Sequence, residues 1–497
     1  MPTSYHLNAN PLVRYLEKDA HDFTREDIIS YVDAHNIRMV NFRYVGGDGR
    51  LKTLNFVITN RRHLEDILTF GERVDGSSLF QFMGTGSSDL YVVPRYRTAF
   101  ENPFSEEPSL EILCSFFNHE GKPLELSPEY VLSKAITRFR EETGLDMKFL
   151  GELEYYVFCK STGHFLATDQ KGYHESEPFS KFERMRKKAL RLIAACGGIV
   201  KYGHSEVGNF LHGDIAYEQH EIEFQPTDPE FAAEQLLVAK WVLRMLALEL
   251  GVELSFAPKI TVGKAGSGMH FHMAIEKDGV NLVRENGVIS DLSKRAIAGI
   301  LEVADGLTAF GNTVPTSYFR LVPNQEAPTN ICWGARNRSV LVRVPLGWAE
   351  GQNMASVANP GVNVGMVSGE GRQTFEFRVP DGSANVHLII AGLIMAVLHG
   401  MRMPDAVAKA DSLYVEGNIA KSGLAGKLKP LPDSCVASAK CLDATRAVFE
   451  SDGVFPPQLI DFTIQFLNRY EDASLRDNLS GNPDGLLEVA TKYMHCQ

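Results

Sequence analysis

Four short apolar stretches of the sequence carry ionisable residues two positions apart. The pairs are Glu152/Glu154, Glu221/Glu223, His270/His272 and Glu376/Arg378. A β-strand turns side chains i and i+2 to the same face, so each pair would lie on one side of a sheet and the apolar neighbours on the other. A single pair would fit an ordinary solvated strand. Four pairs, with Arg343 on a fifth apolar stretch, predict a sheet whose polar face lines a cavity.

The rest of the pattern predicts a small first domain and a larger second one. A helix over 24–36 begins at Thr24, and a hairpin over 39–58 turns at residues 46–49. Pro123 and Pro128 mark a boundary, so we expect domains over 20–120 and 125–497. For the second domain the pattern predicts helices over 231–250, 435–450, 457–472 and 484–494, and a loop over 417–433.

Composition narrows the class of protein. The 497 residues have a hydrophobic fraction of 44% and a net charge of −12, which argues against a general nucleic-acid binder but permits a local basic pocket. The seven cysteines are scattered without a Cys-x-x-Cys motif, which argues against zinc sites and disulfides. The first twenty residues lack an export signal, and the apolar run over 386–398 is too short to span a membrane. We therefore expect a cytoplasmic protein.

The acidic pairs predict a divalent-metal site. Burial of an unpaired carboxylate is strongly unfavourable, so several glutamates on an enclosed face require cations. An oxygen-rich set with one nitrogen suits Mg²⁺ or Mn²⁺. The candidate ligands are Glu152, Glu154, Glu206, Glu221, His270 and Glu376. Pairing with arginine or lysine would explain any one of these glutamates, but not the whole set.

Arginines and a glycine-rich loop indicate an anionic substrate. Arg343 and Arg378 are flanked by strand hydrophobes, and their planar guanidinium groups suit phosphate or carboxylate recognition. Arg336 fits a solvated surface instead. Three glycines between residues 263 and 268 would let the backbone approach a ligand, although an ordinary turn explains that loop equally well.

Six ordered motifs resemble the glutamine synthetase family, closest to type I. They are Val-Asp-Gly-Ser-Ser at 74–78, Gly-Glu-Leu-Glu at 151–154, Gly-Ser-Gly-Met-His-Phe-His at 266–272, Arg-Leu-Val-Pro at 320–323, Arg-Asn-Arg-Ser at 336–339 and Glu-Phe-Arg-Val-Pro-Asp at 376–381. The match spans residues 20–400 in the family's order. It implies an α+β fold, with a small N-terminal β-grasp domain and a large α/β catalytic domain built on a curved antiparallel sheet.

The resemblance also implies roles for matching positions. Glu154, Glu206 and Glu221 would hold one Mg²⁺ or Mn²⁺, and Glu152, His270 and Glu376 the second. Gly266, Arg320 and Arg378 would bind glutamate, while His272, Arg338 and Arg343 would contact ATP. Asp75, Glu326, Arg338 and Arg378 are the expected catalytic residues, with Glu326 closing over the site. Ser78 and Tyr173 complete the ammonium site, to which a neighbouring subunit supplies Asp75 and Ser78.

The implied reaction is ATP-dependent ligation of ammonia to the γ-carboxylate of glutamate. It proceeds through γ-glutamyl phosphate and gives glutamine, ADP and phosphate. The partners are these small molecules and further copies of the same chain, in a homo-oligomer that the resemblance makes a dodecamer. Neither nucleic acid nor a membrane is expected as a partner.

Three departures from the family pattern leave alternatives open. Glu206 and Glu221 lie fifteen residues apart, where the family has about eight, so the intervening residues must loop out or displace one ligand. Ala274 and Thr374 stand where type I enzymes often have serine and arginine. The alternatives are a γ-glutamyl ligase that uses an organic amine and a non-catalytic relative that kept the fold.

Overall fold

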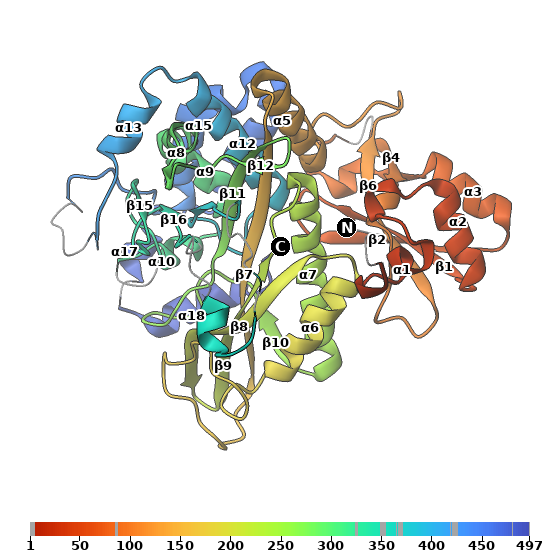
Figure 1. The fold of residues 1–497 in the computed structure, drawn as a ribbon, viewed down its shortest axis with the longest axis horizontal. Helices are drawn as coiled ribbons and strands as arrows, with labels where there is room; N and C mark the ends of the chain where they lie inside the picture. The colour runs from red at the N-terminus through yellow and green to blue at the C-terminus, as the bar shows by residue number, and fades with distance from the viewer. Residues whose placement is uncertain are drawn as a thin grey trace.

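The protein folds into a small N-terminal domain beside a larger one (Figure 1). The computed structural model describes residues 5–84, 88–323, 327–347, 354–363, 365, 371–417, 419, 426–479 and 481–496. The first domain lies at one end of the molecule, and a long sheet with its covering helices makes up the rest.

The N-terminal domain is a mixed sheet with helices packed on it. Its strands are β1 (Met39–Val45), β2 (Leu51–Val57), β3 (Glu72–Asp75), β4 (Asp89–Pro94), β5 (Phe100–Glu101) and β6 (Ser109–Phe117), in the order β2-β1-β6-β4-β3 with β5 on β6. The helices are α1 (Pro11–Leu16), α2 (Arg25–Ala34), α3 (Arg61–Phe70) and α4 (Gly76–Leu79). The predicted start of α2 is confirmed, because Thr24 and Asp27 form a reciprocal capping box. The predicted hairpin is β1–β2.

The second domain is organised by a nine-stranded sheet. Its order is β15-β16-β17-β11-β7-β9-β8, with β10 on β7 and β12 on β11. The strands are β7 (Asp146–Lys160), β8 (Val200–His212), β9 (Ile215–Phe224), β10 (Glu253–Ser255), β11 (Met269–Lys277), β12 (Val280–Asn281), β15 (Trp333–Ala335), β16 (Val342–Val344) and β17 (Phe375–Phe377). All pairings are antiparallel except β15–β16. A separate short hairpin joins β13 (Arg284–Glu285) and β14 (Val288–Ile289).

Helices cover the apolar face of this sheet. Figure 1 shows α6 (Glu183–Ala195) and α7 (Pro229–Leu250) on the side nearer the N-terminal domain. The contact with α7 is close, since a Cβ at Gly151 of β7 would come within 2.8 Å of Leu236. The other helices are α5 (Pro128–Thr143), α8 (Asp291–Glu302), α9 (Ala304–Gly311), α10 (Ser317–Arg320), α11 (Met354–Ala358), α12 (Val386–Arg402), α13 (Ala406–Ser412), α15 (Cys435–Phe449), α16 (Pro457–Asn468), α17 (Leu475–Asn478) and α18 (Pro483–Lys492).

The apolar run over 386–398 forms the buried helix that the sequence predicts. Residues such as Ile389, Ile390 and Leu393 of α12 are fully buried in the main core. Among the described residues, no single helix has the length and apolarity to cross a membrane. Only α12 and α13 together meet that criterion, across a bend of 111°.

Buried ion pairs join the two domains. Glu234 of α7 is buried. Its carboxylate forms ion pairs with two arginines of the N-terminal domain, Arg95 at 2.9 Å and Arg97 at 2.6 Å. The Arg43 guanidinium lies 5.0 Å from the centre of the Trp241 ring. Separating the domains would leave Glu234 without its counter-charges, so the contact holds the N-terminal domain in place.

Candidate active site

The strand register brings the four predicted pairs onto one face of the sheet. Residues directly opposite each other in an antiparallel pair point to the same side. Glu152 lies opposite His270 on one neighbouring strand and Glu223 on the other, while Glu154 lies opposite Glu221. Farther along, Glu376 lies opposite both His272 and Arg343. The predicted polar face is confirmed.

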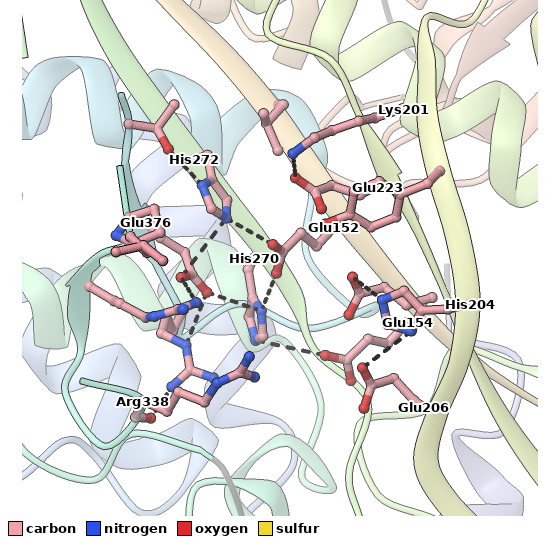
Figure 2. A pocket seen from close by; sticks show the side chains of 18 of the residues that line it. Glu152, Glu154, Lys201, His204, Glu206, Glu223, His270, His272, Arg338 and Glu376 are labelled. Atoms are coloured by element: carbon pink, nitrogen blue, oxygen red, sulfur yellow. Dashed lines mark hydrogen bonds and ion pairs between the residues drawn. The ribbon is translucent and has the colours of Figure 1, made fainter. Parts of the chain in front are cut away.

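This face lines a cavity of about 650 Å³. Carboxylates and imidazoles occupy its floor, and arginines enclose one side (Figure 2). The cavity contains most of the predicted site residues: Glu152, Glu154, Tyr173, Glu206, Glu221, Gly266, His270, His272, Arg320, Arg338, Arg343, Glu376 and Arg378.

One half of the cavity is built around Glu152 and Glu376. Both histidines of β11 contact Glu152, with His270 Nδ1 2.9 Å from Oε2 and His272 Nε2 2.9 Å from Oε1. Glu376 lies 3.4 Å from His270 and 3.9 Å from His272. Nitrogen and oxygen atoms of Glu152, His272 and Glu376 lie within 4.8 Å of one another, close enough to ligate one ion. The structure therefore places both imidazoles beside the carboxylates to which sequence assigned His270 alone.

Arginines neutralise Glu376. Arg378 Nε donates to one carboxylate oxygen at 3.0 Å, and Arg343 Nη1 donates to the other at 3.1 Å. Burial and Glu152 raise the pKa of Glu376, but Arg378 and the two histidines outweigh them and the pKa is lowered. The pKa of Glu152 is likewise well below its usual range, because His272 and His270 outweigh the effect of burial. Both carboxylates are thus held ionised.

The other half is built on the β8–β9 hairpin. Glu206 and Glu221 lie on opposite strands, and oxygens of both lie within 4.8 Å of each other and of a His204 nitrogen. A bulge between Ser205 and Asn209 aims Glu206 into the cavity. Gly208 is required in that bulge, since a Cβ there would lie 2.0 Å from the Tyr156 hydroxyl. The fifteen-residue spacing is taken up by the hairpin itself, so both candidate ligands face the cavity.

Glu154 lies next to this group but has other partners. One of its oxygens accepts hydrogen bonds from the Gly268 backbone N–H at 2.8 Å and from Gln219 Nε2 at 3.1 Å. His204 lies 3.6 Å from Glu221 and 3.7 Å from Glu206, and burial lowers its pKa, which favours the neutral imidazole. In the metal-ligand group that the structure brings together, His204 thus takes the place predicted for Glu154.

Glu221 carries the clearest sign of a missing positive charge. Its pKa is raised well above the usual value, first by burial and then by the carboxylates of Glu152, Glu154, Glu206 and Glu223. A hard divalent cation with oxygen ligands would relieve this repulsion. The donor set of both halves therefore fits Mg²⁺ or Mn²⁺.

In a third part of the cavity, the backbone at Gly266 packs closely against the side chain of Arg320. Arg320 is buried and donates to the carbonyl of Val379 at 2.8 Å and to His270 Nε2 at 3.0 Å. A Cβ at Gly266 would lie 2.9 Å from Arg320 Cγ, so glycine leaves the room there. Arg378 donates to the backbone carbonyl of Arg338, so a predicted glutamate-binding residue contacts a predicted ATP-binding residue. This end can bind a small carboxylate or phosphate.

Asp75 and Ser78 lie outside the cavity, and the described residues that line it all belong to the second domain. Asp75 caps the short helix α4, and its carboxylate accepts the hydroxyls of Ser77 and Ser78 at 2.7 Å each. These serine hydrogen bonds, that of Ser78 first, lower the Asp75 pKa well below its usual value. Glu326 lies outside the described residues.

Several cavity residues were not singled out from the sequence, among them His204, Lys201, Tyr202 and Gln219. His204 was detectable, because it stands two positions before Glu206 on a strand, the pattern used for the other pairs. Tyr202 and Gln219 continue the same alternation, two positions before His204 and Glu221. Lys201 had no such signal, since only the bulge between Val200 and Tyr202 brings it to the polar face. Thr374 was noted only as a departure, yet its hydroxyl hydrogen-bonds with His272 Nδ1 at 2.8 Å and orients that ring.

Comparison with known families agrees with this geometry. The sequence matches the family model described as "Glutamine synthetase, catalytic domain" over residues 125–480 and "Glutamine synthetase, beta-Grasp domain" over residues 36–119. The chain belongs to the glutamine synthetase family. The predicted family and the predicted α+β fold are both confirmed. Family membership supports a ligase that acts on small molecules.

Individual glutamine synthetases are similar at moderate identity. The glutamine synthetase of Thermus thermophilus is 31% identical over 391 residues, covering 76% of this chain and 80% of that protein. The one from Frankia alni is 29% identical over 497 residues, covering 91% and 97%. These identities place the chain within the glutamine synthetase family without fixing its acceptor.

Solved structures show the same fold. A glutamine synthetase of Plasmodium falciparum aligns with a TM-score of 0.73 at 18% identity, covering 91% of this chain and 97% of that one. A structure titled "Apo GmaS without ligand" aligns with a TM-score of 0.71 at 18% identity, covering 92% and 99%. At this identity the likeness concerns the glutamine synthetase fold alone.

Proposed function

We propose that this chain is a glutamate–ammonia ligase that forms glutamine from glutamate, ammonium and ATP. The observation that supports this most is the convergence of six glutamates, three histidines and five arginines on one cavity, in a chain with both family domains. They are Glu152, Glu154, Glu206, Glu221, Glu223, Glu376, His204, His270, His272, Arg320, Arg338, Arg343, Arg372 and Arg378. A surface ion-pair network would not require so many buried carboxylates to face one another.

Two metal groups are proposed on this face. Glu206, Glu221 and His204, with Glu154 beside them, would hold one Mg²⁺ or Mn²⁺. Glu152, Glu376 and the two histidines of β11 would hold the other. When bound, the ions would neutralise negative charge on the transferring phosphoryl group.

The chain's own cations would position the substrates. Arg320 and the open backbone at Gly266 would hold glutamate. Arg338 and Arg343 would face the ATP phosphates and Arg378 the glutamate, and all three would stabilise charge as the γ-phosphoryl group moves to the γ-carboxylate. Arg343 fits this role, because among the described residues its buried Nε has no hydrogen-bond partner. Thr374 would keep His272 turned toward the nucleotide side.

Ammonium would be held by carboxylates from two chains. Glu206 and Tyr173 line the cavity of one chain, and Asp75 and Ser78 would come from a neighbouring subunit of the predicted homo-oligomer. With its lowered pKa, Asp75 stays ionised and can bind a cation. It is also the proposed acceptor of the proton that ammonium loses, after which the amine displaces phosphate from γ-glutamyl phosphate. Glu326 would shield that intermediate from water.

The test is a direct assay with glutamate, ammonium, ATP and Mg²⁺. We expect ammonium-dependent release of phosphate and glutamine detectable by mass spectrometry. The variant E152Q, which removes a ligand charge from the half of the cavity built around Glu152 and Glu376, should lose this activity. Absence of both products in the parent protein would reject the proposed ligase.

A second candidate is a γ-glutamyl ligase for an organic amine. Aromatic rings stand beside His204, which lies 3.7 Å from Glu206. The ring centres of Tyr173 and Tyr202 are 5.4 Å and 5.9 Å from that of His204. Ring faces and a carboxylate suit an alkylammonium ion. Methylamine, ethanolamine and putrescine should be compared with ammonium at equal concentration. Rates far below that with ammonium would dismiss this candidate, and the reverse order would replace the first proposal.

A further inference from the structure

One cationic side chain reaches the carboxylate floor from the edge of the sheet. Figure 2 shows Lys201 extended toward Glu223, and the two atoms Lys201 Nζ and Glu223 Oε1 are 2.5 Å apart. The Lys201 side chain is 41% exposed, whereas that of Glu223 is 4% exposed. The ammonium group therefore sits at the mouth of the cavity, with its partner inside.

A backbone irregularity explains how Lys201 faces inward. Val200 pairs with Phe224 and Tyr202 pairs with Glu223, so Lys201 is an extra residue in β8. In such a bulge two residues oppose one on the partner strand. Both Lys201 and Tyr202 therefore meet Glu223: the tyrosine hydroxyl hydrogen-bonds the carboxylate, and the ammonium lies 5.0 Å from the tyrosine ring centre.

Glu223 is also a member of a third carboxylate group. Oxygens of Glu152, Glu221 and Glu223 lie within 4.8 Å of one another, a separation that one divalent ion could bridge. Glu152 and Glu221 each belong to one of the two proposed metal groups. The third group thus lies between the first two, and Lys201 is the ammonium paired with its remaining member.

We propose that Lys201 is a resident cation that occupies the Glu223 carboxylate and limits the cavity to two divalent ions. This inference rests on the proposed function only through the two metal groups. A tethered ammonium is always present at its partner, so a third ion would have to displace it. Without Lys201, three carboxylates would converge and no cation among the described residues would pair with Glu223. A hard ion with oxygen ligands would then bind there.

The test counts Mn²⁺ ions on the full-length, nucleotide-free protein by equilibrium dialysis, with electron paramagnetic resonance to detect coupling between neighbouring ions. We expect the parent to bind two ions per chain at the cavity and K201M to bind one more, with added line broadening. K201R, which keeps a cation, should match the parent. The double variant K201M/E223Q should return to the parent count, because the third group then loses its added ligand.

K188M is the matched control. Lys188 pairs with Glu249 at 2.8 Å on the surface of the same domain, outside the cavity, so this change alters net charge equally. An unchanged ion count in K201M, or the same increase in K188M, overturns the inference. A parent protein that makes no glutamine but still gains one ion on K201M substitution would reject the proposed ligase while supporting the role of Lys201.

Discussion

The two halves of the cavity differ in how their negative charge is balanced. Around Glu376, arginines and histidines of the chain face each carboxylate within 3.9 Å. Around Glu221, the neighbours are other carboxylates and His204, whose lowered pKa favours the neutral form. The first half is therefore assembled by the chain itself, whereas the second requires cations from solution. The difference indicates where metal binding and stability should be linked.

The largest effect should come from removing a counter-charge in the self-balanced half. In R378M, the buried Glu376 loses its ion pair with Arg378. We expect the free energy of unfolding to fall by about 3–5 kcal/mol. Denaturant titration of the metal-free protein would measure it. R336M, which changes an exposed arginine of the same domain, should remain within about 0.5 kcal/mol of the parent. Equal losses in both variants would contradict the comparison.

The second effect concerns added metal. Mg²⁺ or Mn²⁺ at 100 times its dissociation constant should stabilise the parent by about 2.7 kcal/mol per site, seen as a rise in melting temperature over the protein in chelator. E221Q removes the carboxylate whose neighbours most favour a bound cation, so added metal should raise the melting temperature of E221Q clearly less than that of the parent. Hydrogen-bond geometry is nearly kept in this variant, so a gain equal to that of the parent would show that Glu221 is no ligand.

The third prediction uses pH in chelator. A carboxyl group whose pKa is raised on folding binds its proton more tightly in the folded state, so its contribution to stability is full below its unfolded pKa and is lost as pH rises through the folded pKa. The raised pKa of Glu221 should therefore make the metal-free parent lose stability as pH rises above about 4.5. E221Q should lack this component of the slope.

The Glu376 half should respond in the opposite direction. The pKa values of Glu152 and Glu376 are lowered in the folded protein. Their stabilising contribution is therefore present above the pKa values of the unfolded chain, and it is lost as pH falls through the pKa values of the folded protein. Melting curves of the parent and E221Q between pH 3 and 8 would separate the two halves. Superimposable profiles of the two proteins would remove the basis of the comparison.

The smallest effect should come from the support of one ring. In T374V, His272 loses its hydrogen bond to the threonine hydroxyl at 2.8 Å, and we expect a loss of about 1 kcal/mol in stability. The KM for ATP should rise more than the KM for glutamate, because His272 faces the proposed nucleotide end. T374S keeps the hydroxyl and should restore both values. If T374S restored neither value, the hydrogen bond from residue 374 would not be what orients His272.

Much of the site was predictable because strands have a strict period of two. That rule alone put Glu152 with Glu154 and His270 with His272 on shared faces, and the register then joined the faces. Helix starts were equally local, as the Thr24 capping box shows. The partners of His272 and Glu154 were not predictable, because Thr374 and Gln219 reach them across strands whose order depends on the packed domain.

The long hairpin that carries Glu206 and Glu221 has a wider meaning. The two glutamates lie close together because of the residue pairing between β8 and β9. Residues added beyond the bulge would therefore lengthen the tip of the hairpin, near Gly213, without separating the two glutamates. A search for such enzymes by a fixed gap between acidic residues would overlook this chain. Matching by cross-strand partner instead of by interval should recover other relatives whose loops have drifted in length.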